Sequence, residues 1–165
     1  MSYMFYENYF VPEIKVDNFN PKQVISMSNM FNNYFNLEIL NGSNFNTKNV
    51  IDMSYMFLAY DHLTSLDVSN FDTSKVNNME HMFDSYSSLT SLDLSNFNIE
   101  SITNMNFMFA KFSKLVYLDV SSFNTQKVKG MGSMFHSCSS LISLDISLFD
   151  TENVKQIYYM FYNCY

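Results

Sequence analysis

Apolar residues return to the same positions every 26 residues along this chain. The clearest column consists of six phenylalanines: Phe19, Phe45, Phe71, Phe97, Phe123 and Phe149. A strict period of roughly 20 to 50 residues is typical of repeat proteins, in which each repeat buries its apolar side against its neighbours. The period therefore predicts a single domain over residues 1–165, built as an array of about six 26-residue coils.

One half of each repeat carries apolar residues at helical spacing. In the third copy these are Val76, Met79, Met82, Phe83 and Tyr86. Steps of three and four residues place side chains on one side of a helix. We therefore expect a short helix or 3₁₀ segment in each coil. Asp72 and Thr73 precede it, and both residue types cap helix N-termini.

The other half of each repeat alternates between apolar and polar residues. In the third copy the apolar positions include Leu92 and Leu94, and the polar ones are Ser91, Asp93 and Ser95. This alternation predicts a short strand with its leucines inward and its polar residues outward. Strands of successive coils should pair in parallel about 4.8 Å apart. The predicted fold class is an α/β repeat solenoid, with one strand and one helical segment per coil.

The strand pattern L-x-x-L-x-L, and the longer unit LTSLDLSNF followed by V-x-x-M-x-x-M-F, carry a family resemblance. The chain resembles the BspA-like leucine-rich repeat family, also known as mycoplasma-type surface lipoprotein repeats. That resemblance implies a right-handed leucine-rich-repeat array and a non-enzymatic role in binding host proteins or other cells. The copies at residues 11–14 and 37–40 depart most, because Lys15 and Asn41 replace the aspartate, and we expect these coils to be distorted.

Composition and charge limit the kinds of function and location that are expected. The net charge is −7, with nine lysines and no arginine. Nucleic acid is therefore not an expected partner, since phosphate contacts need a basic surface. No apolar run is long enough to cross a bilayer, and residues 1–10 do not form a secretory signal. The resemblance implies a surface-exposed or secreted protein, and an intracellular location is the alternative.

Catalytic and metal-binding signatures are missing from the sequence. The three histidines, His62, His81 and His136, occupy three different phases of the repeat, so a shared metal site is not expected. There is no glycine-rich phosphate loop, calcium loop or recurring Ser-His-Asp set. We expect no catalytic residues and no cofactor. Cys138 and Cys164 occupy equivalent positions one coil apart and should be buried free thiols rather than a disulfide.

The most suggestive surface feature is a column of aspartates flanked by serines. With one tyrosine, the candidate partner-binding residues are Ser65, Asp67, Ser69, Ser91, Asp93, Ser95, Tyr117, Asp119, Ser121, Ser143, Asp145 and Ser147. Unit charges one strand apart repel by about 1 kcal/mol in water. One interpretation is that solvated carboxylates merely keep the sheet soluble. The other is that they form a docking site for a basic or hydroxyl-rich partner, or transiently for cations.

The two ends of the chain fall in the same half of the repeat. The segment MSYMF at residues 1–5 recurs at 53–57, and the chain stops at Tyr165 before another strand. We expect both ends to lack capping repeats, so the chain is part of a longer array or assembles head-to-tail. The predicted function is protein or cell-surface recognition, as in an adhesion protein. The alternative is a structural protein that assembles head-to-tail.

Overall fold

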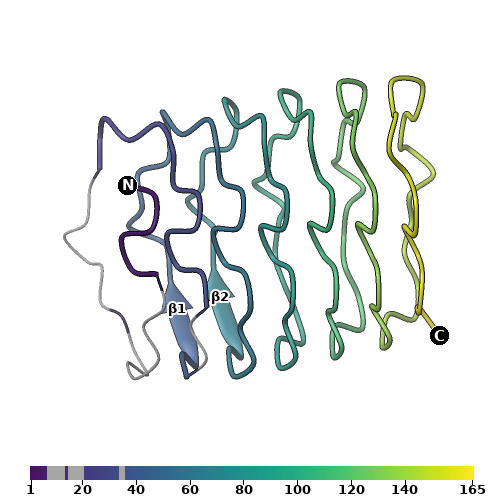
Figure 1. Ribbon diagram of the computed structural model, residues 1–165, viewed down its shortest axis with the longest axis horizontal. Helices are drawn as coiled ribbons and strands as arrows, with labels where there is room; N and C mark the ends of the chain where they lie inside the picture. The colour runs from purple at the N-terminus through teal and green to yellow at the C-terminus, as the bar shows by residue number, and fades with distance from the viewer. Residues whose placement is uncertain (7–13, 15–20, 34–35) are drawn as a thin grey trace.

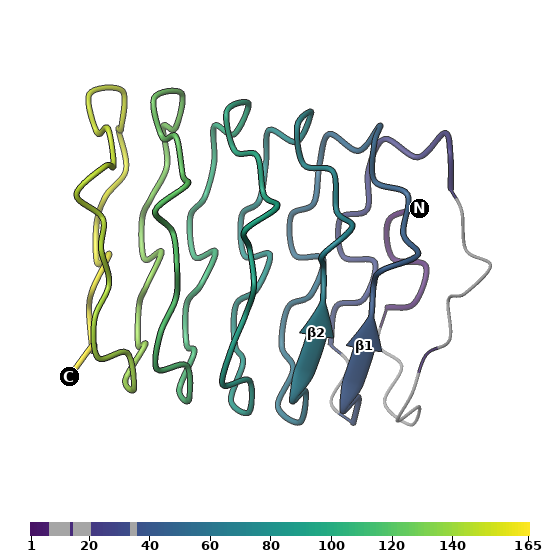
Figure 2. The ribbon, with the colours of Figure 1, turned by 180° about the vertical axis from the view of Figure 1, so that it is seen from behind.

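A computed structural model shows the chain as a row of stacked coils (Figure 1). It describes residues 1–6, 14, 21–33 and 36–165. Strands β1 (Ile39–Asn41) and β2 (Ser65–Asp67) pair in parallel, with Leu40 opposite Leu66. Single parallel bridges repeat the same 26-residue offset along the row, from Ser26 and Asp52 to Gly130 and Gln156. Each coil therefore lies beside the next in one register, as the view from behind also shows (Figure 2).

The predicted α/β fold class, with one strand and one helical segment in each coil, is wrong. The described part of the chain contains no helix and only the two strands β1 and β2. No described segment is therefore a helix able to cross a membrane. Asp72 and Thr73, expected to cap a helix, instead precede a further turn.

The segments expected to be helical are series of turns that bond to the neighbouring coil. The N–H groups of Met79, His81 and Phe83 donate to carbonyls 25 residues later, at 3.0, 2.9 and 3.1 Å. In a helix these groups would donate to the carbonyl four residues earlier. Because alternate N–H groups point along the row, the chain cannot also close helical hydrogen bonds.

Left-handed residues mark the same turns. His81 and Ser85 have φ angles of 53° and 68°, and other coils repeat these two positions. The equivalent residues are Tyr3, Asn29, Asn33, Tyr55, Ala59, Phe107, Lys111, Ser133, Ser137, Tyr159 and Asn163. This conformation costs a non-glycine residue about 1–2 kcal/mol. The hydrogen bonds between coils must offset that cost.

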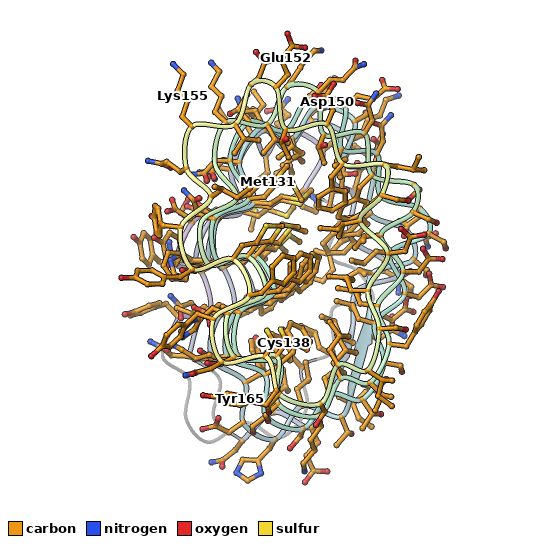
Figure 3. The ribbon with its side chains drawn as sticks, turned by 90° about the vertical axis from the view of Figure 1, so that its right-hand side faces the viewer. Met131, Cys138, Asp150, Glu152, Lys155 and Tyr165 are labelled. Atoms are coloured by element: carbon orange, nitrogen blue, oxygen red, sulfur yellow. The ribbon has the colours of Figure 1, made fainter. Side chains whose placement is uncertain are left out.

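Seen along the row, the coils superimpose as closed outlines filled with side chains (Figure 3). Met131 and Cys138 lie on the inner side of one wall, and Asp150, Glu152 and Lys155 lie at one end of the outline. We call residues 131–138 and their equivalents the turn wall. Residues 141–149 and their equivalents, which include β1 and β2, form the strand wall.

Ladders of like side chains fill the interior. In the phenylalanine ladder, Phe83 stacks on Phe109 with ring centroids 6.0 Å apart, and Phe109 on Phe135 at 5.7 Å. The methionines from Met27 to Met134, and Met160, are buried beside them as the residue columns predict, whereas Met1 and Met4 in the first coil are exposed. On the strand wall Leu92 and Leu94 are buried, whereas Ser91, Asp93 and Ser95 are exposed. The predicted burial is therefore confirmed for these residues, whereas Ile157 and Phe161 in the last coil are exposed.

The expected distortion of the early copies is wrong where it can be checked. Within residues 37–40, Ile39 and Leu40 are the first residues of β1, which pairs with β2 in regular register. Residues 11–13, Lys15 and Phe19 lie outside the described residues.

Both cysteines are free, as predicted. The Cys138 thiol donates to the Phe109 carbonyl at 3.0 Å, and the Cys164 thiol to the Phe135 carbonyl at 2.9 Å. Cys138 is buried, which raises the pKa of its thiol to about 12, but Cys164 is only half-buried. The two thiols thus act as hydrogen-bond donors in the core.

Candidate functional site

The aspartate column lies on the outer side of the strand wall. Asp67 ends strand β2, and three later coils place Asp93, Asp119 and Asp145 at the same position. These three are exposed, and Asp67 is half-buried. Exposed serines flank the column: Ser65, Ser69, Ser91, Ser95, Ser121, Ser143 and Ser147. We call these aspartates and serines the strip.

Each aspartate of the strip closes a tight turn on the strand wall. The N–H of the serine two residues later donates to the carboxylate, at 2.9 Å for Asp93, Asp119 and Asp145 and 3.0 Å for Asp67. Asp and Asn side chains commonly form this turn by bonding their own backbone two residues on. The aspartate column therefore has a local structural role that the sequence analysis did not include.

The same hydrogen bonds favour the ionised carboxylates. The N–H and hydroxyl of the following serine lower the pKa of Asp93 and Asp145 below the ordinary value of 3.8. The hydroxyl and N–H of Ser121 do the same for Asp119, against a smaller opposing effect from the negative charge of Asp145. All three groups are therefore charged at neutral pH.

Asparagine makes the same turn elsewhere in this protein. In the same column, the Asn41 side chain accepts the N–H of Ser43 at 2.9 Å. The next turn along the coil uses either residue type in the same way: Asn46, Asp72, Asn98, Asn124 and Asp150. The turn thus needs an acceptor oxygen but no charge. Local structure does not explain why four successive coils carry aspartate.

The charges of the strip are also left without cations. Residues 63–71, 89–97, 115–123 and 141–149 each contain one aspartate and no lysine. Within the described ranges, no ion pair joins a lysine to a strip carboxylate, although Lys111 lies 3.8 Å from the Asp84 carboxylate on the turn wall. The strip is therefore an acidic surface without internal neutralisation.

Two hollows lie on either side of Asp119. One, of about 380 Å³, is lined by residues 117–121 and 143–145 and so lies between Asp119 and Asp145. The other, of about 270 Å³, is lined by residues 92–95, Asp119, Ser121 and Ser122. The predicted site residue Tyr117 lines the larger hollow and is exposed. The structure thus brings Tyr117 together with two of the aspartates.

A buried polar cluster on the turn wall was not predicted. The Asp84 carboxylate is buried, with Oδ2 2.7 Å from His81 Nδ1 and Oδ1 accepting the Ser85 hydroxyl at 2.8 Å. The His81 ring stacks between the rings of Tyr55 and Phe107. A buried carboxylate needs such partners, so the cluster has a structural role. No three His, Cys, Asp or Glu residues in the described chain are placed to hold a metal ion.

A signal for this cluster was present in the sequence. Asn29 and Asn32 occupy the same two positions as His81 and Asp84 in an earlier coil, and their side chains hydrogen-bond at 2.7 Å. In both coils, two polar residues three positions apart interrupt a segment that is otherwise rich in apolar residues, and this pattern could have indicated the cluster.

Comparison with known proteins gives one family. Residues 1–115 and 85–165 match the family described as Mycoplasma protein of unknown function, DUF285. No curated protein and no solved structure matches the chain. The match bears out the mycoplasma part of the resemblance, and the leucine-rich-repeat part gains no support from it.

Proposed function

The chain belongs to the DUF285 family of Mycoplasma proteins, since two matches to that family together include every residue, and we propose that it is a non-enzymatic recognition protein. Its strip would dock a partner protein or a cell-surface ligand. Asp93, Asp119 and Asp145 would supply the charge, and the flanking serines would supply hydrogen-bonding groups.

The main support for the proposal is that four coils have aspartate at a position where asparagine would form the same turn. Asn41 shows that the turn forms without charge, yet the next four coils carry Asp at this position. Like charges on neighbouring coils repel by about 1 kcal/mol per pair in water. A cationic partner would convert this unfavourable term into a favourable one.

The state of the carboxylates suits long-range attraction. Asp93, Asp119 and Asp145 are exposed and ionised, and no lysine of the described chain neutralises them. Complementary charge across an interface chiefly speeds association and selects partners. The strip would therefore favour basic partners and reject acidic ones.

The same features argue against acid–base catalysis at the strip. A carboxyl group that donates a proton near neutral pH needs a raised pKa, which burial supplies in enzymes. Here hydrogen bonds lower the pKa of Asp93, Asp119 and Asp145, and all three are exposed. Their chemistry fits recognition better than turnover.

A comparison of two double variants tests the proposal. Asp93→Asn with Asp119→Asn removes two charges from the strip and keeps both turns. Asp52→Asn with Asp72→Asn removes two charges elsewhere, where Asn78 and Asn98 already make the equivalent turns in the next coil. Each immobilised variant is exposed to an extract of candidate host or partner cells, and captured proteins are quantified by mass spectrometry.

We expect at least one partner to be retained by the wild type and the control variant and depleted on the strip variant. Equal retention on all three proteins would refute a role for the strip. Melting curves by circular dichroism confirm that both variants are folded. Head-to-tail assembly stays a separate prediction, which light scattering tests as a mass that grows with concentration.

A further inference from the structure

We propose that the partner docks through a basic segment that places an apolar side chain on one end of the strip. The binding surface is an apolar patch, Val116, Tyr117 and Ile142, together with Asp119 and Asp145. This inference rests on the proposed function and adds the location of the contact and the chemistry of the partner.

The patch is formed by two neighbouring coils of the strand wall. Tyr117 bridges to Ser143, and the N–H of Ile142 donates to the Val116 carbonyl at 3.1 Å, so Val116 and Ile142 are neighbours across the coils. Their side chains remain exposed to 46% and 83%, and that of Tyr117 to 62%. Three apolar side chains therefore face solvent side by side.

Packing within the repeat does not require these residues. Earlier coils carry Thr64 and Thr90 at the position of Val116 and Ile142, and all four residues are exposed. At the position of Tyr117, serine stands in three other coils: Ser65, Ser91 and Ser143. The repeat therefore folds with polar residues here, and the apolar ones need another explanation.

The patch adjoins a hollow with charged walls. Tyr117, Asp119 and Asp145 all line the 380 Å³ hollow between the two coils. Tyrosines at such positions commonly anchor interfaces when a partner side chain fills the adjoining space. The ionised carboxylates would pair with lysine or arginine residues next to that side chain.

Charge complementarity also decides between possible occupants. A second copy of this chain carries the same net charge of −7 and would meet the strip with repulsion. An anionic lipid surface would be repelled for the same reason. A cationic peptide segment satisfies both the carboxylates and the apolar patch.

The spacing of the coils sets the length of that segment. The parallel bridge between Tyr117 and Ser143 corresponds to a spacing of about 4.8 Å between these two coils. Asp93, Asp119 and Asp145 occupy three successive coils, which is about the length of three residues of extended chain at roughly 3.3 Å each. A short extended segment with several lysines or arginines can therefore contact all three carboxylates.

Fluorescence anisotropy with labelled heptapeptides tests the inference on the full chain. The probes are KKLKKLG, the polar analogue KKSKKSG and the acidic analogue EELEELG. The patch variant, Tyr117→Ser with Ile142→Thr, restores the residues of other coils. The strip variant is Asp119→Asn with Asp145→Asn, and the matched control is Asp52→Asn with Asp72→Asn.

We expect the wild type to bind KKLKKLG more tightly than KKSKKSG and to show no binding of EELEELG. The patch variant should lose roughly tenfold affinity for KKLKKLG and little for KKSKKSG, as for truncation of an interface anchor. The strip variant should lose roughly fivefold per carboxylate for both lysine peptides, an upper value for exposed ion pairs. The control should bind as the wild type does.

Two results would overturn the inference, and only the second would also contradict the proposed function. If the patch variant binds both lysine peptides as the wild type does, the patch is not the anchor, while the strip can still be the docking face. If the strip and control variants lose equal affinity, only total charge matters. That second result would contradict the proposed function as well.

Discussion

At the scale of single residues, the strip aspartates combine two roles that substitutions can separate. The side-chain oxygen accepts the serine N–H and closes a turn, and the negative charge faces solvent. Asparagine keeps the first role and removes the second, as Asn41 shows within the same column. Alanine removes both.

Stability should therefore respond more to alanine than to asparagine. We predict that Asp93→Ala lowers the free energy of unfolding more than Asp93→Asn does, because asparagine keeps the hydrogen bond that alanine removes. Urea denaturation followed by circular dichroism measures both. Equal losses in the two variants would show that the charge itself stabilises the fold.

The same carboxylates predict a dependence of stability on acid. Asp93, Asp119 and Asp145 have a lower pKa in the folded chain than the ordinary 3.8, so they contribute stability above that pH. This contribution is lost as the pH falls from about 4 through the folded values. Between pH 5 and pH 3 the melting temperature of the wild type should fall further than that of a variant in which all three aspartates are changed to asparagine. Parallel losses would contradict the assigned shifts.

The buried tyrosines of the turn wall provide a matched pair. The Tyr60 hydroxyl donates to the Phe31 carbonyl, whereas the Tyr86 hydroxyl has no partner among the described residues. Burial also raises the pKa of Tyr86 well above 10.0. We predict that Tyr60→Phe costs about 1 kcal/mol and that Tyr86→Phe is neutral or stabilising, because it removes an unsatisfied buried group. Denaturant titration compares them, and a larger loss for Tyr86→Phe would contradict this account.

At the scale of elements, the sequence predicted which residues are buried better than it predicted the backbone. Met79, Met82 and Phe83 are buried as their spacing indicates, but they lie in turns. Steps of three and four residues also fit a chain that makes three-residue turns and bonds to a neighbouring coil. Periodicity alone cannot distinguish that conformation from a helix. On the strand wall, too, the alternation predicted burial better than backbone, since only β1 and β2 are strands among the described residues.

The sequence predicted some features of the candidate site and could not predict others. The exposure of the aspartates and serines followed from alternation along one strand. The hollow between Asp119 and Asp145 and the contact between Val116 and Ile142 depend on how two coils lie against each other. Those features require the three-dimensional structure.

Two alanines of the turn wall test the observed backbone. Ala59 has a φ of 65°, which glycine adopts without strain, and Ala110 does not share this conformation. We predict that Ala59→Gly leaves the free energy of unfolding unchanged or raises it by up to about 1 kcal/mol. Ala110→Gly should lower it by about 1 kcal/mol. In a helix both changes would cost about 1 kcal/mol, so equal losses would contradict the turn structure.

At the scale of the whole molecule, the regular offset between coils turns a local turn residue into an extended charged surface. Because each coil repeats its neighbour's register, one aspartate per coil becomes a column along the row. Exposed charges of this kind act over about 8–10 Å at moderate ionic strength and weaken as salt is added. The account therefore places recognition on one face of the row.

Carbodiimide cross-linking of a captured partner tests that central claim most directly, since it joins carboxylates to lysine amines in direct contact. Peptide mapping by mass spectrometry then identifies the linked residues. The account predicts cross-links at Asp93, Asp119 and Asp145, which disappear when these residues are changed to Asn. Cross-links confined to Asp52, Asp72 or other acids outside the strip would contradict it.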